Sequence, residues 1–254
     1  MIALTVAGSD CGGGAGVQAD LKTFAALGIY GTSAITAITV QNTLGVSAVH
    51  ALGPQLVAAQ IAAVREDFGV AAVKLGMLAT PEIVAAVGEA LAGAPGVVYD
   101  PVMVASSGDA LMREGFVAAA MRLFPRLDLL TPNLAEAARF LGRPEARTEA
   151  EMEAQGGALV ALGARAVLMK GGHLEGEAVD LLVTAEGARR FAAPRIASRN
   201  LHGTGCVLSS AIAAYIARGL DLPEAVAQAK AFTRRAIENG RALALGNGAG
   251  PLIP

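Results

Sequence analysis

The sharpest chemical signal is the segment His202-Gly203-Thr204-Gly205-Cys206, which opens a strongly apolar helical stretch. The free N–H groups and the dipole of a helix N-terminus bind anions. Gly203, Thr204 and Gly205 therefore predict an anion hole that stabilises charge on a phosphoryl group in transfer. Cys206 is expected in the first helical turn, where a thiol pKa falls below about 8.5. The resulting thiolate would accept a proton from an alcohol; the alternative is a small apolar side chain packed on a sheet.

A segment from Gly8 to Asp20 follows the first apolar run and begins with a glycine-rich loop. Glycines let a backbone approach a ligand closely. Two familiar glycine-rich loops do not fit. Val17 stands where the dinucleotide-binding fingerprint needs its third glycine, and Lys22 follows a leucine instead of the glycine of a Walker A loop. Asp20 is expected one helical turn beyond the loop, facing what the loop faces; the alternative is a surface carboxylate favoured by the helix dipole.

Further candidates follow other predicted strands. Gln41 has an amide that offers donors and an acceptor to the edge of a flat heterocycle, although an asparagine-containing turn explains Gln41-Asn42-Thr43 equally well. Met77 and Val104 would form an apolar wall for a ring, or belong to the core. Asp100 precedes a proline at a strand end, where a carboxylate can hold Mg²⁺ through water.

Three more polar residues point to phosphate and metal. Asn133 is expected to cap a helix with Glu136 at its third position, a capping box that is a structural explanation by itself. The functional interpretation is that this pair touches Mg²⁺ and phosphate-bound water. Lys170 ends a buried strand, where a lysine is rarely left without a partner, and two glycines after it would let its ammonium reach an anion. The glycines of 246–250 would let the tail fold back on an adenine, or leave it disordered.

These residues must be positioned by alternating strands and helices. Apolar, β-branched runs predict strands over 2–7, 33–40, 71–75, 97–100, 127–131, 166–170, 179–184 and 189–193. Helical patterns lie at 15–27, 54–68, 81–92, 114–123, 133–141, 148–162, 206–218 and 223–242. The alternation predicts a mostly parallel sheet with helices on both faces, and ligands bind such sheets at the carboxyl ends of the strands. The region 173–194 is expected to form a local antiparallel hairpin, and no linker is visible, so residues 1–254 are predicted to form a single domain.

Composition excludes several classes of protein. The chain has 254 residues, of which 54% are hydrophobic and 17% charged, so general disorder is excluded. A net charge of −2, with no tryptophan and 4% aromatic residues, gives no sign of nucleic-acid binding. No stretch has the length of a membrane span or the charged start of a signal peptide. The two cysteines, Cys11 and Cys206, are expected to be free thiols, which favours a cytoplasmic protein.

The motifs together resemble the ribokinase-like superfamily and, within it, the hydroxymethylpyrimidine kinase/phosphomethylpyrimidine kinase family of thiamine biosynthesis. Six pieces occur in the family's order: GGAGVQADLKTF (13–24), QNT (41–43), DPVM (100–103), TPN (131–133), KGGH (170–173) and HGTGC (202–206). Each is weak alone, but six in order are specific, and they span nearly the whole chain. Cys11 departs from the serine or proline usual at its position.

The resemblance implies a three-layer α/β sandwich that uses ATP and Mg²⁺ to phosphorylate 4-amino-5-hydroxymethyl-2-methylpyrimidine and then its monophosphate. In that interpretation Asp20 binds the hydroxymethyl group, Gln41 binds the polar edge of the ring, and Gly8, Met77 and Val104 complete the substrate site. Residues expected to serve the nucleotide and metal are Asn133 and Glu136 near Mg²⁺, Asp100 as a further metal ligand, Lys170 on the ATP phosphates, and Gly203 to Cys206 as the anion hole with Cys206 as the base. The family also implies a homodimer. A pyridoxal or pyridoxine kinase is the alternative enzyme, and a non-catalytic metabolite-binding protein is the alternative from another class.

Overall fold

A computed structural model describes residues 1–103, 114–172 and 176–254 of the chain. Its strands are β1 (Ile2–Asp10), β2 (Tyr30–Asn42), β3 (Gly45–Ala51), β4 (Val70–Leu75), β5 (Val97–Tyr99), β6 (Leu129–Leu130), β7 (Ala166–Lys170), β8 (Ala178–Thr184) and β9 (Gly187–Ala193). Its α-helices are α1 (Gly16–Ala26), α2 (Pro54–Asp67), α3 (Pro81–Ala90), α4 (Phe116–Met121), α5 (Leu134–Leu141), α6 (Glu149–Ala161), α7 (Thr204–Ala217) and α8 (Leu222–Gly240), and a 3₁₀ turn covers Phe124–Arg126.

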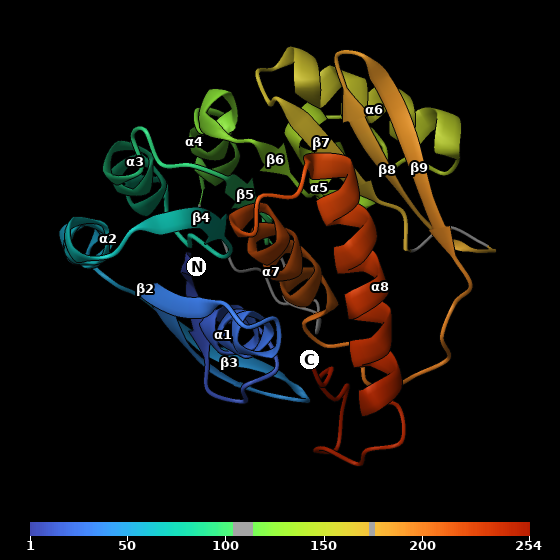
Figure 1. Cartoon of the computed structure of the whole chain (residues 1–254), viewed down its shortest axis with the longest axis horizontal. Coiled ribbons are helices and arrows are strands. Elements are labelled where there is room, and N and C mark those ends of the chain that lie inside the picture. The colour runs from blue at the N-terminus through green and yellow to red at the C-terminus, as the bar shows by residue number, and fades with distance from the viewer. Residues whose placement is uncertain (104–113, 173–175) are drawn as a thin grey trace.

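The described strands form one sheet in the order β3-β2-β1-β4-β5-β6-β7-β8-β9 (Figure 1). Neighbours from β2 to β7 are parallel, while β3, β8 and β9 pair antiparallel at the two ends. The predicted α/β class and the hairpin within 173–194 are therefore confirmed. The strand order reverses beside β1, because β2 lies on one side of it and β4 on the other, and such a reversal opens a crevice at the carboxyl ends of the strands.

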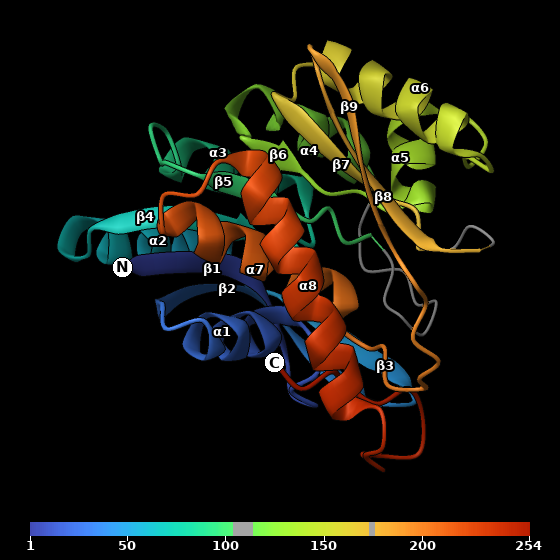
Figure 2. The same ribbon diagram turned by 45° about the vertical axis from the view of Figure 1, so that its right-hand side comes forward.

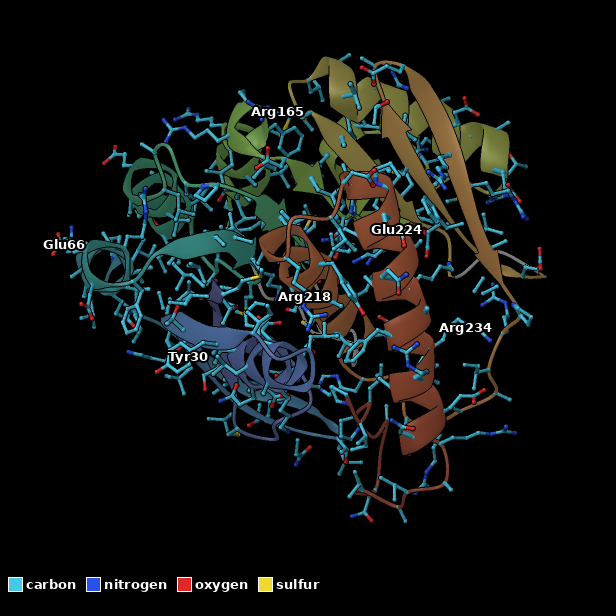
Figure 3. The ribbon with its side chains drawn as sticks, in the orientation of Figure 1. Tyr30, Glu66, Arg165, Arg218, Glu224 and Arg234 are labelled. Carbon is cyan, nitrogen blue, oxygen red and sulfur yellow. The ribbon has the colours of Figure 1, made fainter. Side chains whose placement is uncertain are left out.

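Helices cover the sheet on both faces, which makes three layers (Figures 1 and 2). Side chains of α1, α7 and α8 form one apolar core with the sheet, and side chains of α2 to α6 form the other. Parallel strands buried on both faces need continuous apolar sequence, and β1 is buried from Ala3 to Gly8. Charged side chains such as Glu66, Arg165 and Glu224 are exposed on the outer surface of the molecule (Figure 3). None of the described helices has the length and apolar character needed to cross a membrane.

Three differences from the prediction bear on the site. Strand β3 was not predicted: its residues are mostly exposed because it is an edge strand, so it lacks the apolar run used to find the others. Strand β2 extends through Gln41 and Asn42, which places these residues in a hairpin rather than after a strand. Helix α7 begins at Thr204, two residues before the predicted start, because Gly203 adopts a left-handed backbone (φ 86°) that caps it.

Candidate active site

The N-terminus of α7 lies against the carboxyl ends of β5 and β7. A Cβ placed on Gly205 would lie 3.2 Å from both a carboxylate oxygen of Asp100 and the ammonium of Lys170. Gly203 cannot be replaced without a shift, because a Cβ there would meet the Gly14 carbonyl oxygen. The structure thus brings the predicted anion-binding helix start, Gly203 to Gly205, to the predicted phosphate-binding lysine.

Asp100, Lys170 and Glu136 form a buried charge cluster beside this helix start. The ammonium of Lys170 donates to Asp100 Oδ1 at 2.6 Å. Burial alone would lower the pKa of Lys170, yet the charges of Asp100 and Glu136 raise it, so the lysine stays protonated. Burial, with the charge of Asp100, raises the pKa of Glu136 to about 7 against the opposing charge of Lys170. The cluster holds one cation against two acidic groups and is therefore suited to a further positive charge.

The capping box predicted at Asn133 is confirmed. Asn133 Oδ1 accepts from the Glu136 N–H at 2.8 Å, and Glu136 Oε2 accepts from the Asn133 N–H at 2.7 Å. One oxygen of Glu136 is therefore engaged by the backbone, while its charge also couples to Asp100 and Lys170. The structural explanation holds, and contact with Mg²⁺ or phosphate stays a prediction.

The predicted low pKa of Cys206 is wrong. The thiol lies in the first turn of α7, as expected, but it is buried, and burial raises its pKa to about 11. The charges of Asp20 and Asp100 add to this rise, whereas the Lys74 ammonium and the Gly16 N–H oppose it. Desolvation outweighs the helix dipole here because an anion loses more on leaving water than the dipole returns. Cys206 therefore carries a proton at neutral pH in the unliganded protein.

Asp20 is fully buried, so the alternative of a surface carboxylate is wrong. Its oxygens accept from the Lys74 ammonium at 2.8 Å, from the Thr5 hydroxyl at 2.6 Å and from the Ser210 hydroxyl at 2.7 Å. These four groups join β1, α1, β4 and α7 behind the site. With its carboxylate taken up in this way, Asp20 is placed to position its neighbours, and direct contact with a substrate stays a prediction.

Asp10 organises the glycine-rich turn. Its carboxylate accepts from the backbone N–H groups of Gly12, Gly14 and Ala15 at 2.8, 3.1 and 2.9 Å. Burial would raise the pKa of Asp10, but the hydrogen bonds from His202, Gly12 and Ala15 lower it below its ordinary value. The turn is therefore built around a carboxylate that remains ionised.

Gln41 lies beside His202, whose ring also contacts Asp10. Gln41 Nε2 and His202 Nε2 are 3.2 Å apart, and His202 Nε2 and Asp10 Oδ2 are 3.2 Å apart. Met77 is buried over Gly8, since a Cβ on that glycine would meet the Met77 sulfur at 3.2 Å. Val104, the other half of the predicted apolar wall, lies outside the described residues.

The tail folds back on the β2–β3 hairpin. The Gly248 N–H donates to the Thr43 hydroxyl at 3.1 Å, and His202 forms a short parallel bridge with Pro251. Residues 246–251 thus hold the Gln41 hairpin and the start of α7 together. The predicted contact with an adenine remains a prediction.

Three site residues were missed in the sequence analysis: Lys74, Asp10 and His202. Lys74 carried a usable signal, since a lysine inside an apolar strand needs a buried anion, as argued for Lys170. Asp10 and His202 stood within recognised motifs, but their contact spans 192 residues and no local pattern reveals it.

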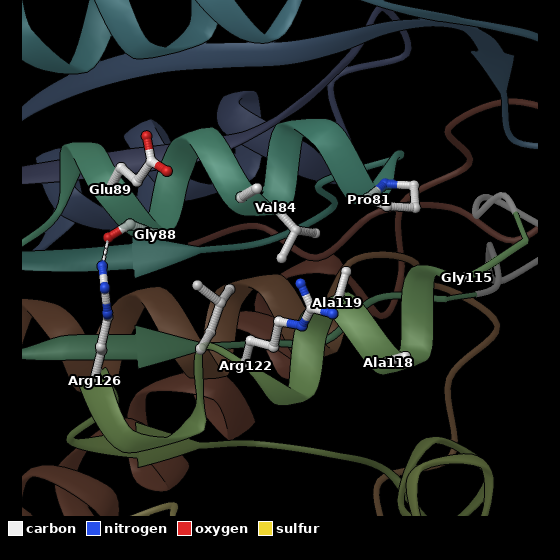
Figure 4. Close-up of a pocket in the computed structure, with 11 residues that line it drawn as sticks. Pro81, Val84, Gly88, Glu89, Gly115, Ala118, Ala119, Arg122 and Arg126 are labelled. Carbon is white, nitrogen blue, oxygen red and sulfur yellow. Dashed lines mark hydrogen bonds between the residues drawn. The ribbon is translucent and has the colours of Figure 1, made fainter.

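A separate hollow of about 370 Å³ lies between α3 and α4 (Figure 4). It is lined by Val84, Gly88, Arg122 and Arg126 among others, and none of the predicted site residues that the structure describes borders it. Within residues 1–103, 114–172 and 176–254, no three His, Cys, Asp or Glu side chains gather as a metal centre would require.

Comparison with known proteins gives one family across the chain. The family model for phosphomethylpyrimidine kinase matches residues 10–253. A hydroxymethylpyrimidine/phosphomethylpyrimidine kinase of Rhizobium meliloti is 54% identical over 254 residues, covering 99% of this chain and 96% of the relative. The crystal structure of phosphomethylpyrimidine kinase from Clostridium difficile is 42% identical, with a TM-score of 0.82 over 93% of this chain and 99% of that one. The pyridoxal kinase of Staphylococcus aureus, solved with pyridoxal, is 33% identical, with a TM-score of 0.89 over 99% of this chain and 92% of that one.

The full-length match to the family model and a relative above half identity agree with the motif order and with the observed sheet. This chain is therefore a member of the phosphomethylpyrimidine kinase family.

Proposed function

We propose that this protein transfers the γ-phosphoryl group of ATP to 4-amino-5-hydroxymethyl-2-methylpyrimidine, and then transfers a second one to the resulting monophosphate. The product would be the diphosphate used in thiamine assembly. Family membership supports the reaction class, and the names of the relatives support this acceptor. Structures of the Staphylococcus aureus pyridoxal kinase with AMP-PCP and with ADP support ATP as the donor.

One observation carries the proposal: the start of α7 faces the Lys170–Asp100 pair across Gly205. A phosphoryl group bound there would meet backbone N–H donors from one side and an ammonium from the other. Phosphoryl transfer depends mainly on positioning and on stabilising charge around the transferred group, which these two elements would supply.

The roles of the cysteine differ between the two steps. A substrate alcohol must lose its proton, and Cys206 is the candidate base. Its raised pKa makes the thiolate scarce but more basic, and the two effects oppose each other. A phosphate monoester, whose second pKa is about 6, is already partly ionised near neutrality and scarcely needs a base.

We infer that Mg²⁺ binds near Asp100 and Glu136 through water and ATP phosphates. Burial, together with the charge of Asp100, raises the pKa of Glu136, so a cation nearby would favour its ionised form. Hydrated Mg²⁺ is typically held by one or two carboxylates with substrate phosphates. The ion would neutralise charge on the phosphates, while Lys170 and the α7 N-terminus hold the transferred group.

A pyridoxal kinase is the second candidate, favoured by the high structural similarity to pyridoxal kinases. A coupled ADP-release assay with Mg-ATP separates the two, using the hydroxymethylpyrimidine, its monophosphate and pyridoxal as acceptors. Turnover of the first two with little turnover of pyridoxal is the expected result. A kcat/KM that favours pyridoxal would move the protein to vitamin B6 salvage with the same chemistry, and no transfer to any acceptor would favour a binding protein.

We also infer a single kinase domain over 1–254, acting as a homodimer in the cytoplasm. One sheet that receives strands from both halves of the chain supports the single domain. Ile38 and Val40 lie on the same face of β2 and are 41% and 57% exposed, which suits a second copy of the chain. Two free cysteines suit a reducing compartment. Light scattering of the wild type and of Val40→Glu tests the dimer, and a wild-type monomer would contradict it.

A further inference from the structure

We propose that the Asp10–His202 pair fixes the orientation of the Gln41 side-chain amide, and so fixes which amide atom acts as donor and which as acceptor toward the phosphoryl acceptor. His202 is thus a positioning residue for specificity. The proposal rests on the proposed function in one respect, that Gln41 reads the edge of a flat heterocycle.

The first step concerns the proton of His202. Its Nε2 lies 3.2 Å from an oxygen of Asp10, which the hydrogen bonds of the glycine-rich turn keep ionised. A carboxylate can only accept, so an unprotonated Nε2 would set lone pair against lone pair. Asp10 therefore favours a proton on Nε2, in either the neutral or the charged ring.

The second step follows from the same nitrogen. Nε2 of His202 is also 3.2 Å from the terminal amide of Gln41. A protonated Nε2 is a donor, so the amide atom facing it must be an acceptor. The Gln41 amide is therefore turned over relative to the placement given above, so that its oxygen, and not its nitrogen, faces His202. One N–H shared between two oxygens at 3.2 Å is a three-centre hydrogen bond. The oxygen and nitrogen of a glutamine amide have nearly the same shape, so hydrogen bonding decides their assignment.

Thr39 provides independent support from the other end of the amide. Its hydroxyl lies 3.0 Å from the Ser9 carbonyl oxygen, which can only accept, so the single hydroxyl proton is directed there. The same hydroxyl oxygen is 3.1 Å from the other terminal atom of Gln41 and can accept a hydrogen bond from it. With the amide nitrogen facing Thr39 and the amide oxygen facing His202, each hydrogen bond has one donor and one acceptor. Gln41 then donates to the Thr39 hydroxyl oxygen and accepts from His202 Nε2.

The backbone of Gln41 is held by the same turn. The Cys11 thiol donates to the Gln41 carbonyl oxygen at 3.1 Å. The His202 ring is itself confined, because a Cβ on Gly14 would meet its Cδ2 atom. Gln41 therefore has a fixed main chain, and its side chain lies between two directional neighbours.

The consequence is a defined edge for recognition. His202 and Thr39 each use one hydrogen-bonding site of the amide, which leaves one lone pair on the oxygen and one N–H on the nitrogen. An aminopyrimidine presents an amino donor beside a ring-nitrogen acceptor, which matches this pair in one order only. Reversing the amide would exchange donor and acceptor, so the amide and the amino and ring-nitrogen groups of the substrate would be left unpaired. A site built from hydrogen bonds rejects a ligand that leaves its polar groups unpaired.

The proton on His202 is tested directly by ¹⁵N NMR of the full-length protein labelled at histidine. The chain has 3 histidines, His50, His173 and His202, and His202→Phe identifies the signals of interest. We expect a protonated Nε2 at neutral pH. A neutral ring with the proton on Nδ1 would overturn the proposal, whatever the enzyme phosphorylates.

The link to Gln41 is tested by a double-mutant cycle of His202→Phe and Gln41→Leu, with kcat and KM measured for the pyrimidine. His202→Phe alone should lower kcat/KM by about tenfold, mainly through KM. In the Gln41→Leu background the same change should cost less than about twofold, because contacts that act through one residue do not add. Equal losses in both backgrounds would mean that His202 serves the loop alone and would overturn the proposal. His202→Asn provides a second variant should His202→Phe fold poorly.

The two proposals fail in distinguishable ways. If the wild type prefers pyridoxal, the proposed substrate is wrong, and the cycle with pyridoxal still reports whether His202 acts through Gln41. If the pyrimidine is the substrate and the cycle is additive, only the orienting role is lost. His50→Phe, in the exposed edge strand β3, is the matched control and should leave both constants unchanged.

Discussion

The Lys74 ammonium lies 2.8 Å from the Asp20 carboxylate, and neither side chain has any exposed surface. The charge of Asp20 raises the pKa of Lys74 although burial opposes the change, so the pair is ionic. Two charges are thereby held in the interior beside α7, where the Ser210 and Thr5 hydroxyls donate to the same carboxylate.

Removing one member of this pair should be costly. Lys74→Met leaves Asp20 uncompensated, and the free energy of unfolding in urea should fall by about 3 to 5 kcal/mol. The double variant Asp20→Asn/Lys74→Met should recover most of that loss because it buries no charge. Arg165→Met, which breaks the exposed pair with Asp128, is the control and should change stability by less than about 1 kcal/mol. A double variant no more stable than Lys74→Met would contradict this account.

Cys206→Ala should harm the first phosphorylation more than the second. The alcohol needs a base, and loss of general-base catalysis costs about 10² to 10⁴ in rate, whereas the monoester should lose less than about tenfold. Single-turnover rates with each acceptor measure the ratio of the two losses within one variant. Equal losses would show that Cys206 positions the substrate and does not take its proton.

The two thiols should react at very different rates with a thiol-specific reagent such as DTNB. Cys11 is exposed, whereas Cys206 is buried and has its pKa raised to about 11. Only the thiolate reacts, so at pH 8 one thiol per chain should react quickly and Cys11→Ser should abolish that phase. The slow phase should accelerate as pH rises toward 11. Because the folded pKa lies above the unfolded value, this thiol lowers stability only as pH rises above about 9.

Lys170→Met should weaken both binding and transfer of the phosphoryl group. The variant removes the ammonium that faces the α7 N-terminus and leaves Asp100 without its partner at 2.6 Å. We expect kcat/KM for ATP to fall by about 10² to 10³, with KM for the pyrimidine changed much less. Arg165→Met removes a cation just before the other end of the same strand, β7, and should leave kcat/KM for ATP unchanged. A variant with normal ATP kinetics would exclude Lys170 from the phosphate site.

The sequence predicted the layered sheet because strands such as β1 begin with a mostly apolar run, and this pattern is local. It also placed Lys170 and Asp100 correctly at strand ends, where the topology brings them together. Edge strand β3 was not predicted because most of its residues are exposed, so its sequence lacks the apolar run that marks a buried strand. The prediction of a low pKa for Cys206 was wrong because that pKa depends on burial by residues distant in the sequence. The Asp10–His202 contact was missed because it, too, joins residues far apart in the chain.

The contact between Asp10 and His202 joins residues 192 positions apart. A growing polypeptide on the ribosome can pair β1 with β2 early, but Asp10 and Gln41 can contact His202 only after the segment that leads into α7 has been synthesised. Closing so long a segment is slow compared with local pairing. A nascent chain stalled before α7 lacks part of the proposed phosphate site. We therefore expect such a chain neither to bind nucleotide nor to consume ATP.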